Sequence, residues 1–280
     1  MSENFDSVPY HIPVLVTQVI EGLAIKPHGV YLDVTFGGGG HTRAILQSDP
    51  TVKVIGFDWD QIALDLAYDG MMQEFPGRLR LIWGNFSHLY KLLKKHNISA
   101  VDGILADFGT SQFQIHNTKG LSFREDTPLD MRLSHSHYTT TAATIVNFAS
   151  PDELRHIFWT YGQEPFTREI VAAIVEYRQK KKFKTTGELV TLIEKIVYHK
   201  GKIHPATRVF QALRIVVNHE LENIEAFLPA ALAALRPGGR LACISFHSLE
   251  DRIVKEFCRN AQRTQDGLII KPECIQATEE

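Results

Sequence analysis

A glycine-rich loop bordered by acidic residues is the first group in this sequence that could hold a ligand. The segment Asp33–Thr42 reads DVTFGGGGHT and contains four consecutive glycines, Gly37–Gly40. Glycine allows positive φ angles and lets the backbone approach a ligand closely. A helix that begins after such a loop directs its free amide groups toward the same place. The loop is therefore a candidate site for a nucleotide-like cofactor.

The spacing of these glycines excludes two common nucleotide sites. The dinucleotide fingerprint G-x-G-x-x-G requires a final glycine, and its two registers here place Thr42 and Arg43 at that position. A P-loop requires lysine and then serine or threonine after its last glycine, whereas His41 follows Gly40. A plain glycine-rich turn remains the alternative to cofactor binding.

Two further carboxylates favour S-adenosylmethionine as the cofactor. Asp58 lies 21 residues beyond Gly37, and a carboxylate at that spacing can accept both hydroxyl groups of a ribose. Asp33 would repel a pyrophosphate but would attract the amino group of a methionine moiety. Asp107 could accept hydrogen bonds from an amine that is being alkylated, or could cap the next turn. Phe86 would either stack on adenine or belong to the core.

The composition indicates a globular protein without a strong charge bias. Of its 280 residues, 44% are hydrophobic and 22% are charged, and the formal net charge is -2. This length allows one large domain or two smaller ones, and any nucleic-acid contact would have to use a local basic patch. We expect a cytoplasmic protein, because the sequence has neither a secretory signal nor about 18 consecutive apolar residues. Three cysteines without CxxC spacing argue against a disulfide framework and a metal site: Cys243, Cys258 and Cys274.

Short apolar runs that alternate with helical patterns predict a parallel sheet in the first part of the chain. The carboxyl ends of such strands meet at one edge, where ligands bind. The glycine loop, Asp58 and Asp107 all follow predicted strands and should lie there. The four predicted strands are Val30–Thr35, Lys53–Phe57, Leu79–Trp83 and Ala100–Ala106.

The second part of the chain has helical periodicity and regains a strand only near its end. A turn at Pro237–Gly239 should lead into a strand at Arg240–Phe246. We therefore expect an α/β core formed by residues 1–115 and 206–280, with an inserted helical substrate-recognition domain at 116–205. The predicted helical segments are Thr141–Phe148, Pro151–Tyr161, Thr167–Arg178, Thr186–Tyr198 and the long pattern Pro205–Leu235.

Several long motifs resemble, in order along the chain, the small-subunit (16S) ribosomal RNA cytosine-N4 methyltransferases, the RsmH or MraW family. The resemblance implies a class I Rossmann-like methyltransferase fold with a parallel central sheet and an inserted all-helical domain. It also implies methyl transfer from S-adenosylmethionine to the N4 amine of a cytidine in the decoding region. The matching segments are His11–Leu15, Asp33–Thr42, Gly120–Leu133, Thr160–Glu164, His204–Leu221 and Pro237–Lys255.

The resemblance also implies roles for individual residues in cofactor binding. Asp58 would bind the ribose and Phe86 would lie at the adenine. One departure from the family pattern is Gln112, which replaces a serine of the motif after the fourth strand. The complete set of predicted cofactor-binding residues is Asp33, Gly37, Gly39, Gly40, His41, Asp58, Phe86, Asp107 and Gln114.

Methylation of a cytosine amine needs alignment and proton removal more than a nucleophile on the protein. The lone pair of the N4 amine is delocalised into the ring, so positioning and electrostatics must supply much of the catalysis. We expect Asp107 to orient the amine. Ser245, His247 and Ser248 would line the same pocket from the last strands. For His247, a proton acceptor and a structural hydrogen-bonding role both remain open.

The expected partner is small-subunit ribosomal RNA or the ribosomal subunit, with the target base splayed out of its stack. Arg124, Arg132 and Arg208 lie inside the matching motifs and, with Ser248, are candidate RNA contacts. The basic run Arg178–Lys184 could contact phosphates or be a solvated helix end. The alternatives are a methyltransferase for another nucleic acid or a small molecule, and a non-catalytic RNA-binding relative. No membrane partner is expected, and a homodimer is left open.

Overall fold

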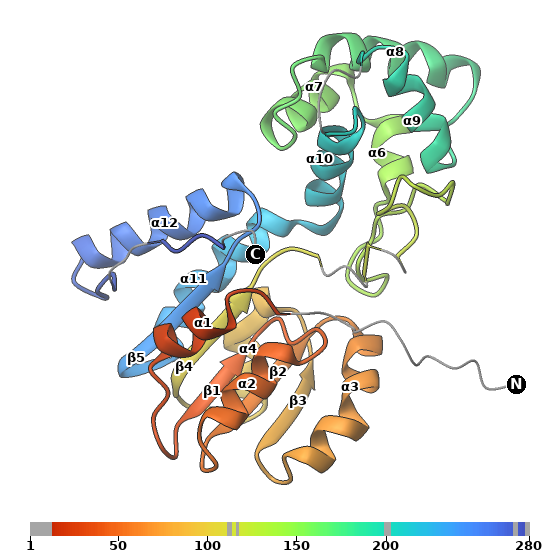
Figure 1. Ribbon diagram of the computed structural model, residues 1–280. Helices are drawn as coiled ribbons and strands as arrows, with labels where there is room; N and C mark the ends of the chain where they lie inside the picture. Colours follow the sequence, from red (N-terminus) through yellow and green to blue (C-terminus); the bar gives the residue numbers. More distant parts are fainter. Residues whose placement is uncertain (1–12, 111–113, 116–117, 199–202, 271–273, 278–280) are drawn as a thin grey trace, which may run out of the picture. The chain divides into compact units, whose positions relative to one another are not determined.

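The computed structural model describes residues 13–110, 114–115, 118–198, 203–270 and 274–277, which form two compact units. The first unit consists of residues 1–111 and 221–280, and the second of residues 112–220 (Figure 1). The second unit is thus inserted in the sequence between the two parts of the first. Among the described residues, no helix is both long enough and apolar enough to cross a membrane.

A five-stranded parallel sheet forms the centre of the first unit, with the strand order β3-β2-β1-β4-β5. The reversal of strand order at β1 makes this a doubly wound, Rossmann-like sheet. The four strands predicted in the first part of the chain are confirmed; β3 has the predicted bounds, and the other three differ by one or two residues at their ends. The strands are β1 (Val30–Asp33), β2 (Lys53–Asp58), β3 (Leu79–Trp83), β4 (Val101–Asp107) and β5 (Leu235–Ile244).

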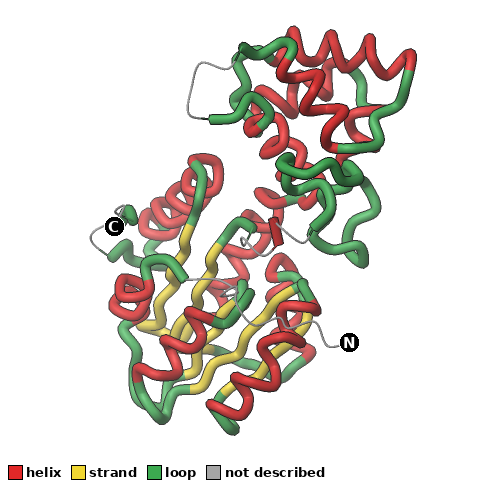
Figure 2. The backbone as a smooth tube through the Cα atoms, turned by 45° about the vertical axis from the view of Figure 1, so that its right-hand side comes forward, coloured by secondary structure: helices red, strands yellow, loops and turns green. Residues whose placement is uncertain are grey.

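The strand register brings the predicted acidic residues to one edge of the sheet. Asp33 pairs with Leu105 of β4, and Asp107 pairs with Ile244 of β5. Asp58 is the last residue of β2. Figure 2 shows the strands side by side with helices on both faces. The carboxyl ends of the strands therefore position these acids, as the sequence predicted.

Alternate residues of each strand pack toward opposite helical layers. Tyr31 packs in a core with the three helices of one layer, whereas its neighbour Leu32 packs in a core with the other layer. The first layer contains α1 (Val16–Leu23), α2 (Gly40–Ser48) and α3 (Gln61–Glu74). The second contains the 3-10 helix η1 (Phe86–His88), α4 (Leu89–Lys95), α11 (Glu220–Ala234) and α12 (Ser248–Arg263).

Both ends of β5 differ from the sequence prediction, which had a turn at Pro237–Gly239 and a strand at Arg240–Phe246. Residues 236–239 extend β5 as an irregular segment, with a register shift against β4 and a φ of 76° at Gly238. The strand stops at Ile244, so Ser245 and His247 follow the strand, and Ser248 begins helix α12. Their predicted place on the last strands was wrong, because His247 caps a helix at this point.

The second unit is helical and has its own hydrophobic core. Its helices are α6 (Ala142–Phe148), α7 (Pro151–Thr160), α8 (Thr167–Lys180), α9 (Thr186–Glu194) and α10 (Thr207–Asn218). Ser150 and Glu153 form a capping box at the start of α7, where the sequence indicated a helix start at Pro151. The core includes Leu154, Ile170 and Leu189.

Helix α10 belongs to the second unit by its packing. Its side chains Val209, Phe210 and Leu213 are buried in the helical core of that unit. The expected boundary at 205/206 therefore differs from the observed one at 220/221. The predicted long helix Pro205–Leu235 is also broken, because His219 adopts a left-handed conformation with φ 49° and ends α10.

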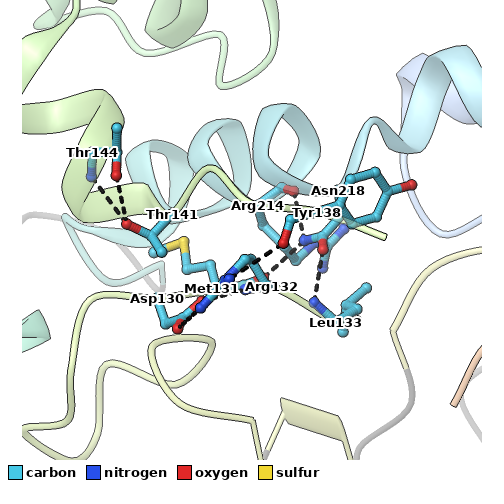
Figure 3. Close-up of polar contacts among 9 residues, drawn as sticks. All are labelled: Asp130, Met131, Arg132, Leu133, Tyr138, Thr141, Thr144, Arg214 and Asn218. Carbon is cyan, nitrogen blue, oxygen red and sulfur yellow. Dashed lines mark hydrogen bonds and ion pairs between the residues drawn. The ribbon is translucent and has the colours of Figure 1, made fainter. Parts of the chain in front are cut away.

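A polar network ties the segment around Met131 to helix α10 (Figure 3). The fully buried Asn218 donates from Nδ2 to the carbonyl oxygen of Met131 at 2.9 Å and accepts the amide of Leu133 at 2.8 Å. Arg132 donates to both carboxylate oxygens of Asp130, at 2.7 and 2.8 Å. The network fixes a non-helical segment that contains the positive φ of Met131, which is 69°.

Replacement of Asn218 tests this network. Asn218→Ala removes the partner of the buried Met131 carbonyl and of the half-buried Leu133 amide, so the free energy of unfolding should fall by about 2–3 kcal/mol. Urea unfolding followed by circular dichroism measures the change. Gln179→Ala, at an exposed amide on α8, is the control and should shift the free energy by less than about 0.5 kcal/mol. Equal stabilities of the two variants would contradict this role of Asn218.

Candidate active site

Asp33 lies buried at the end of β1 and holds the glycine loop together. The Thr42 hydroxyl donates to Asp33 Oδ2 at 2.7 Å, and the Thr35 amide donates to Oδ1 at 3.3 Å. Only 1% of Asp33 is exposed, and this burial raises the pKa of its carboxyl group above the ordinary value. The predicted loop residue therefore supports the turn between strand and helix.

Asp58 reaches the same loop from the end of β2. Its Oδ2 accepts the Gly37 amide at 2.7 Å, and its Oδ1 accepts the Asp60 amide at 2.9 Å. Burial raises the pKa of Asp58 to about 7 despite these two hydrogen bonds. Each carboxylate oxygen has two acceptor sites, so Asp58 retains capacity for a ligand hydroxyl group. The predicted ribose contact is compatible with this geometry and stays a prediction.

The glycines of the loop have steric reasons for their positions. Gly39 has a φ of 74°, and a Cβ atom there would lie 2.3 Å from Met71 Sδ. A Cβ atom on Gly40 would lie 2.8 Å from Pro13 Cγ. The loop therefore has no room for side chains at these two positions, because neighbouring side chains of the protein fill the space.

Asp107 has an unusual environment at the end of β4. Its Oδ1 atom is buried and has no hydrogen-bond partner among the described residues. Burial, together with the negative charges of Asp33 and Glu250, raises the pKa of Asp107 to about 7. A buried carboxylate oxygen without a donor is costly, so this atom is a candidate contact for a ligand.

His41 connects Asp107 to the start of the described chain. Its Nε2 lies 2.8 Å from the carbonyl oxygen of Val14, and its Nδ1 lies 3.7 Å from Asp107 Oδ2. Because a carbonyl oxygen can only accept, Nε2 must carry a proton. Nε2 of the imidazole thus donates its hydrogen bond to the protein backbone. The predicted cofactor contact of His41 stays a prediction.

Phe86 lies in an aromatic cluster. Its ring centroid is 5.8 Å from that of Phe108 and 5.5 Å from that of Phe227. The side chain of Asn85 caps the short helix η1 by accepting the Ser87 amide. Phe86 remains partly exposed. It therefore contributes to the core, and a second role against adenine stays a prediction.

The segment after β5 lies beside Asp107. Ile244 pairs with Asp107 in the sheet, and Ser245 follows it directly. His247 is the N-cap of α12, where its Nδ1 accepts the Glu250 amide at 3.4 Å. A neutral His247 therefore carries its proton on Nε2, which faces Glu250 Oε1 at 3.3 Å. In this conformation His247 has no free lone pair for a substrate proton, although its catalytic role stays a prediction.

Glu250 is the residue of this site that the sequence analysis missed. It is 1% exposed, its Oε2 accepts the Phe246 amide at 2.8 Å, and its charge acts on Asp107. The signal was present, because Glu250 lies three residues after His247 in the pattern of a helix start.

The other predicted residues belong to the second unit or lie outside the pocket. Gln114 is described within the second unit, and Gln112 lies outside the described residues. Arg124 is exposed, Arg208 is half-buried, and Arg132 is paired with Asp130. Ser248 is exposed at the start of α12. The predicted cofactor and RNA roles of these residues stay predictions.

The arrangement suits a ligand that carries positive charge. Asp33, Asp58 and Asp107 gather at one sheet edge, and no lysine or arginine among the described residues forms an ion pair with any of them. Like charges that are buried together raise one another's pKa, and a cation placed among them would reverse the effect. Hydrogen-bond acceptors and a tight glycine loop complete the site.

Comparisons with known proteins find one matching family and many similar chains. The model of the MraW methylase family matches residues 9–279. Ribosomal RNA small subunit methyltransferase H of Rhodopseudomonas palustris is 43% identical over 268 residues, which cover 95% of this chain and 80% of the relative. The protein of the same name from Nostoc punctiforme is 47% identical over 255 residues, which cover 90% and 82%. Among solved structures, TrmN from Thermus thermophilus is 24% identical with a TM-score of 0.30, covering 35% of this chain and 28% of that one.

The raised pKa of Asp107 predicts a pH-dependent stability. The folded protein keeps this proton up to about pH 7, whereas the unfolded chain releases it near the ordinary value of 3.8. The carboxyl group therefore destabilises the ligand-free protein increasingly as the pH rises from about 4 to about 7. Asp107→Asn should gain stability over the natural protein across this window, by about 1 kcal/mol per pH unit. Urea unfolding at several pH values measures the difference, with exposed Asp152→Asn as control. If the difference in stability between Asp107→Asn and the natural protein were independent of pH, the raised pKa of Asp107 would be refuted.

Proposed function

This chain belongs to the MraW methylase family, and we propose that it transfers a methyl group from S-adenosylmethionine to small-subunit ribosomal RNA. The acceptor in this proposal is the N4 amine of a cytidine in the decoding region. The unpartnered Oδ1 atom of Asp107 is the structural observation that carries the proposal, because it offers an acceptor for an amine at the edge where ligands bind.

The residues at the sheet edge fit S-adenosylmethionine. Asp33 would face the amino group of its methionine part, and Asp58 would accept the ribose hydroxyl groups. The backbone of Gly37, Gly39 and Gly40 would lie against the ligand, because the loop directly follows the carboxyl end of β1. The bound cofactor supplies a methyl group on a positively charged sulfur. That charge would favour ionisation of the surrounding carboxyl groups.

Asp107 would orient the amine of the cytosine. An ionised carboxylate accepts a hydrogen bond from an N–H group, which holds the nitrogen and directs its electron density toward the methyl carbon. As the new N–C bond forms and the S–C bond breaks, the nitrogen loses one proton. Asp107 can accept that proton as a carboxylate, because burial and the negative charges of Asp33 and Glu250 raise its pKa and so strengthen it as a proton acceptor.

The segment from Ser245 to Glu250 would complete the wall of this pocket. Ser245 lies next to the strand position that pairs with Asp107. The buried Glu250 keeps negative charge near Asp107 and raises its pKa, which makes Asp107 a better proton acceptor. His247 would hold the helix start in place through its cap.

We assign the RNA substrate by analogy with the relatives, which are named ribosomal RNA small subunit methyltransferase H. We place the reaction in the cytoplasm, with Arg124 and Arg208 of the helical unit as candidate RNA contacts. Whether two copies associate is a separate question, which sedimentation of the purified protein answers.

The test of this function is a methylation assay with small-subunit RNA and free cytidine. The natural protein should produce N4-methylcytidine in the RNA alone, as detected by mass spectrometry of the digested nucleosides. Asp107→Ala should lower kcat by at least about 100-fold, because it removes the positioning and the proton acceptor. Calorimetry should still detect cofactor binding by this variant. Near-normal turnover of Asp107→Ala would exclude its proposed role, and absence of methylated RNA with the natural protein would exclude the function.

A further inference from the structure

One stretch of the first unit contains basic residues and no acidic ones. No acidic residue occurs between Glu74 and Asp102, although the whole chain has a formal net charge of -2. The same stretch contains Arg78, Arg80, Lys91, Lys94 and Lys95. A local excess of this kind in a chain that is otherwise slightly acidic creates a positive surface potential.

Helix α4 arranges three of these side chains on one face. Lys91, Lys94 and Lys95 are spaced at i, i+3 and i+4, so they lie together on the helix surface. All three are exposed. None forms an ion pair or a side-chain hydrogen bond with another described residue. The three lysines define what we term the α4 lysine face.

Arg80 extends the α4 lysine face from the edge strand β3. Its guanidinium donates to His96, at 2.9 Å to Nδ1 and 3.4 Å to the carbonyl oxygen. Burial, and then the positive charges of Arg80 and Lys95, lower the pKa of His96. His96 therefore tends to stay neutral and accept from Arg80, which keeps the arginine beside the lysines.

The basic run Arg178–Lys184, which the sequence also indicated as a phosphate contact, has a different environment. Lys180 pairs with Glu176 at 2.7 Å, and Lys181 pairs with Glu188 at 2.6 Å. Lys182 lies over the ring of Phe148. Arg178 donates to two backbone carbonyl oxygens. The basic side chains of that run thus mostly interact with other groups of the second unit, whereas the α4 lysine face has no acidic partner among the described residues.

We propose that the α4 lysine face, together with Arg80, binds phosphate groups of the RNA substrate. Helix α4 directly follows η1, the turn that carries Phe86 after the carboxyl end of β3. An RNA strand that enters the candidate active site can therefore continue along this helix. Tyr90 is 68% exposed and stands beside Lys91 in the chain, as in surfaces that combine basic residues with an aromatic ring for a base. This inference rests on the proposed function, because it assigns a further contact to the same RNA.

The experiment compares RNA affinity as a function of salt for the full-length chain. Fluorescence anisotropy with a labelled decoding-region fragment of small-subunit RNA gives the Kd between about 0.1 M and 0.5 M salt. The plot of log K against log salt has a negative slope, and each lost phosphate contact makes that slope less steep by about 0.7. The variant Lys91→Gln/Lys94→Gln/Lys95→Gln should therefore bind about fivefold to 100-fold more weakly at 0.1 M salt, depending on whether one or all three lysines make contact.

Two matched triple variants control for charge and for position. Lys91→Arg/Lys94→Arg/Lys95→Arg keeps the charge and should bind within about twofold of the natural protein. Lys180→Gln/Lys181→Gln/Lys182→Gln removes the same number of charges from the ion-paired run and should also leave the affinity and the slope nearly unchanged. Cofactor affinity, measured by calorimetry, reports that each variant is folded.

Three outcomes would overturn the inference. The Gln variant at α4 could bind RNA with unchanged affinity and slope, or the two Gln variants could weaken binding equally, which would indicate unspecific attraction. If the natural protein methylates RNA in either case, only this inference fails. A natural protein that neither binds nor methylates the RNA would overturn the proposed function as well.

Discussion

Burial of several carboxyl groups at one edge of the sheet is the constraint on which the rest of this structure depends. Parallel strands necessarily bring their carboxyl ends together, and here β1, β2 and β4 each end in an aspartate. Taking such groups out of water disfavours their charged form, and their mutual repulsion adds to that cost. The pKa values of about 7 for Asp58 and Asp107 express this cost directly. A cationic ligand would relieve it.

The surrounding structure limits the cost with hydrogen bonds from the glycine loop. Thr42 donates to Asp33, and the Gly37 amide donates to Asp58, so the loop conformation and the acids stabilise each other. Gly39 and Gly40 are required because Met71 and Pro13 fill the space that side chains would take. Asp107 lacks such compensation at Oδ1. The site is thus well ordered on its cofactor side and unsatisfied at the point assigned to the substrate.

Much of the fold and of the acidic site could be predicted from the sequence. The β-branched runs and the glycine loop located the first four strands, and parallel pairing then placed Asp33, Asp58 and Asp107 together. The end of β5 was harder to predict from the sequence. The N-cap geometry of His247, which places Ser248 in a helix, is visible only in the structure. Glu250 escaped notice because a glutamate near a helix start is ordinarily an exposed capping residue. The break between α10 and α11 depends on the left-handed backbone conformation of His219, which no local sequence pattern indicated.

The two parts of the chain differ in how their charge is used. In the helical unit, Arg132, Lys180 and Lys181 pair with acids, so motif membership or a basic run alone was a poor guide to RNA contact. In the α/β unit, acids are buried at the ligand edge and lysines are exposed on α4. That separation of charge suits an enzyme that takes a cationic cofactor and a polyanionic substrate.

The most direct test of this account is proton release when S-adenosylmethionine binds. Calorimetry in buffers of different ionisation enthalpy, between about pH 5.5 and 8, counts the protons exchanged on binding. If the cationic cofactor binds among acids with pKa values near 7, protons should be released below about pH 7 and the affinity should rise with pH through that range. Binding of S-adenosylhomocysteine, which lacks the charged sulfur, should release fewer protons from the protein. Binding of both ligands with the same affinity at every pH and without proton exchange would contradict the account.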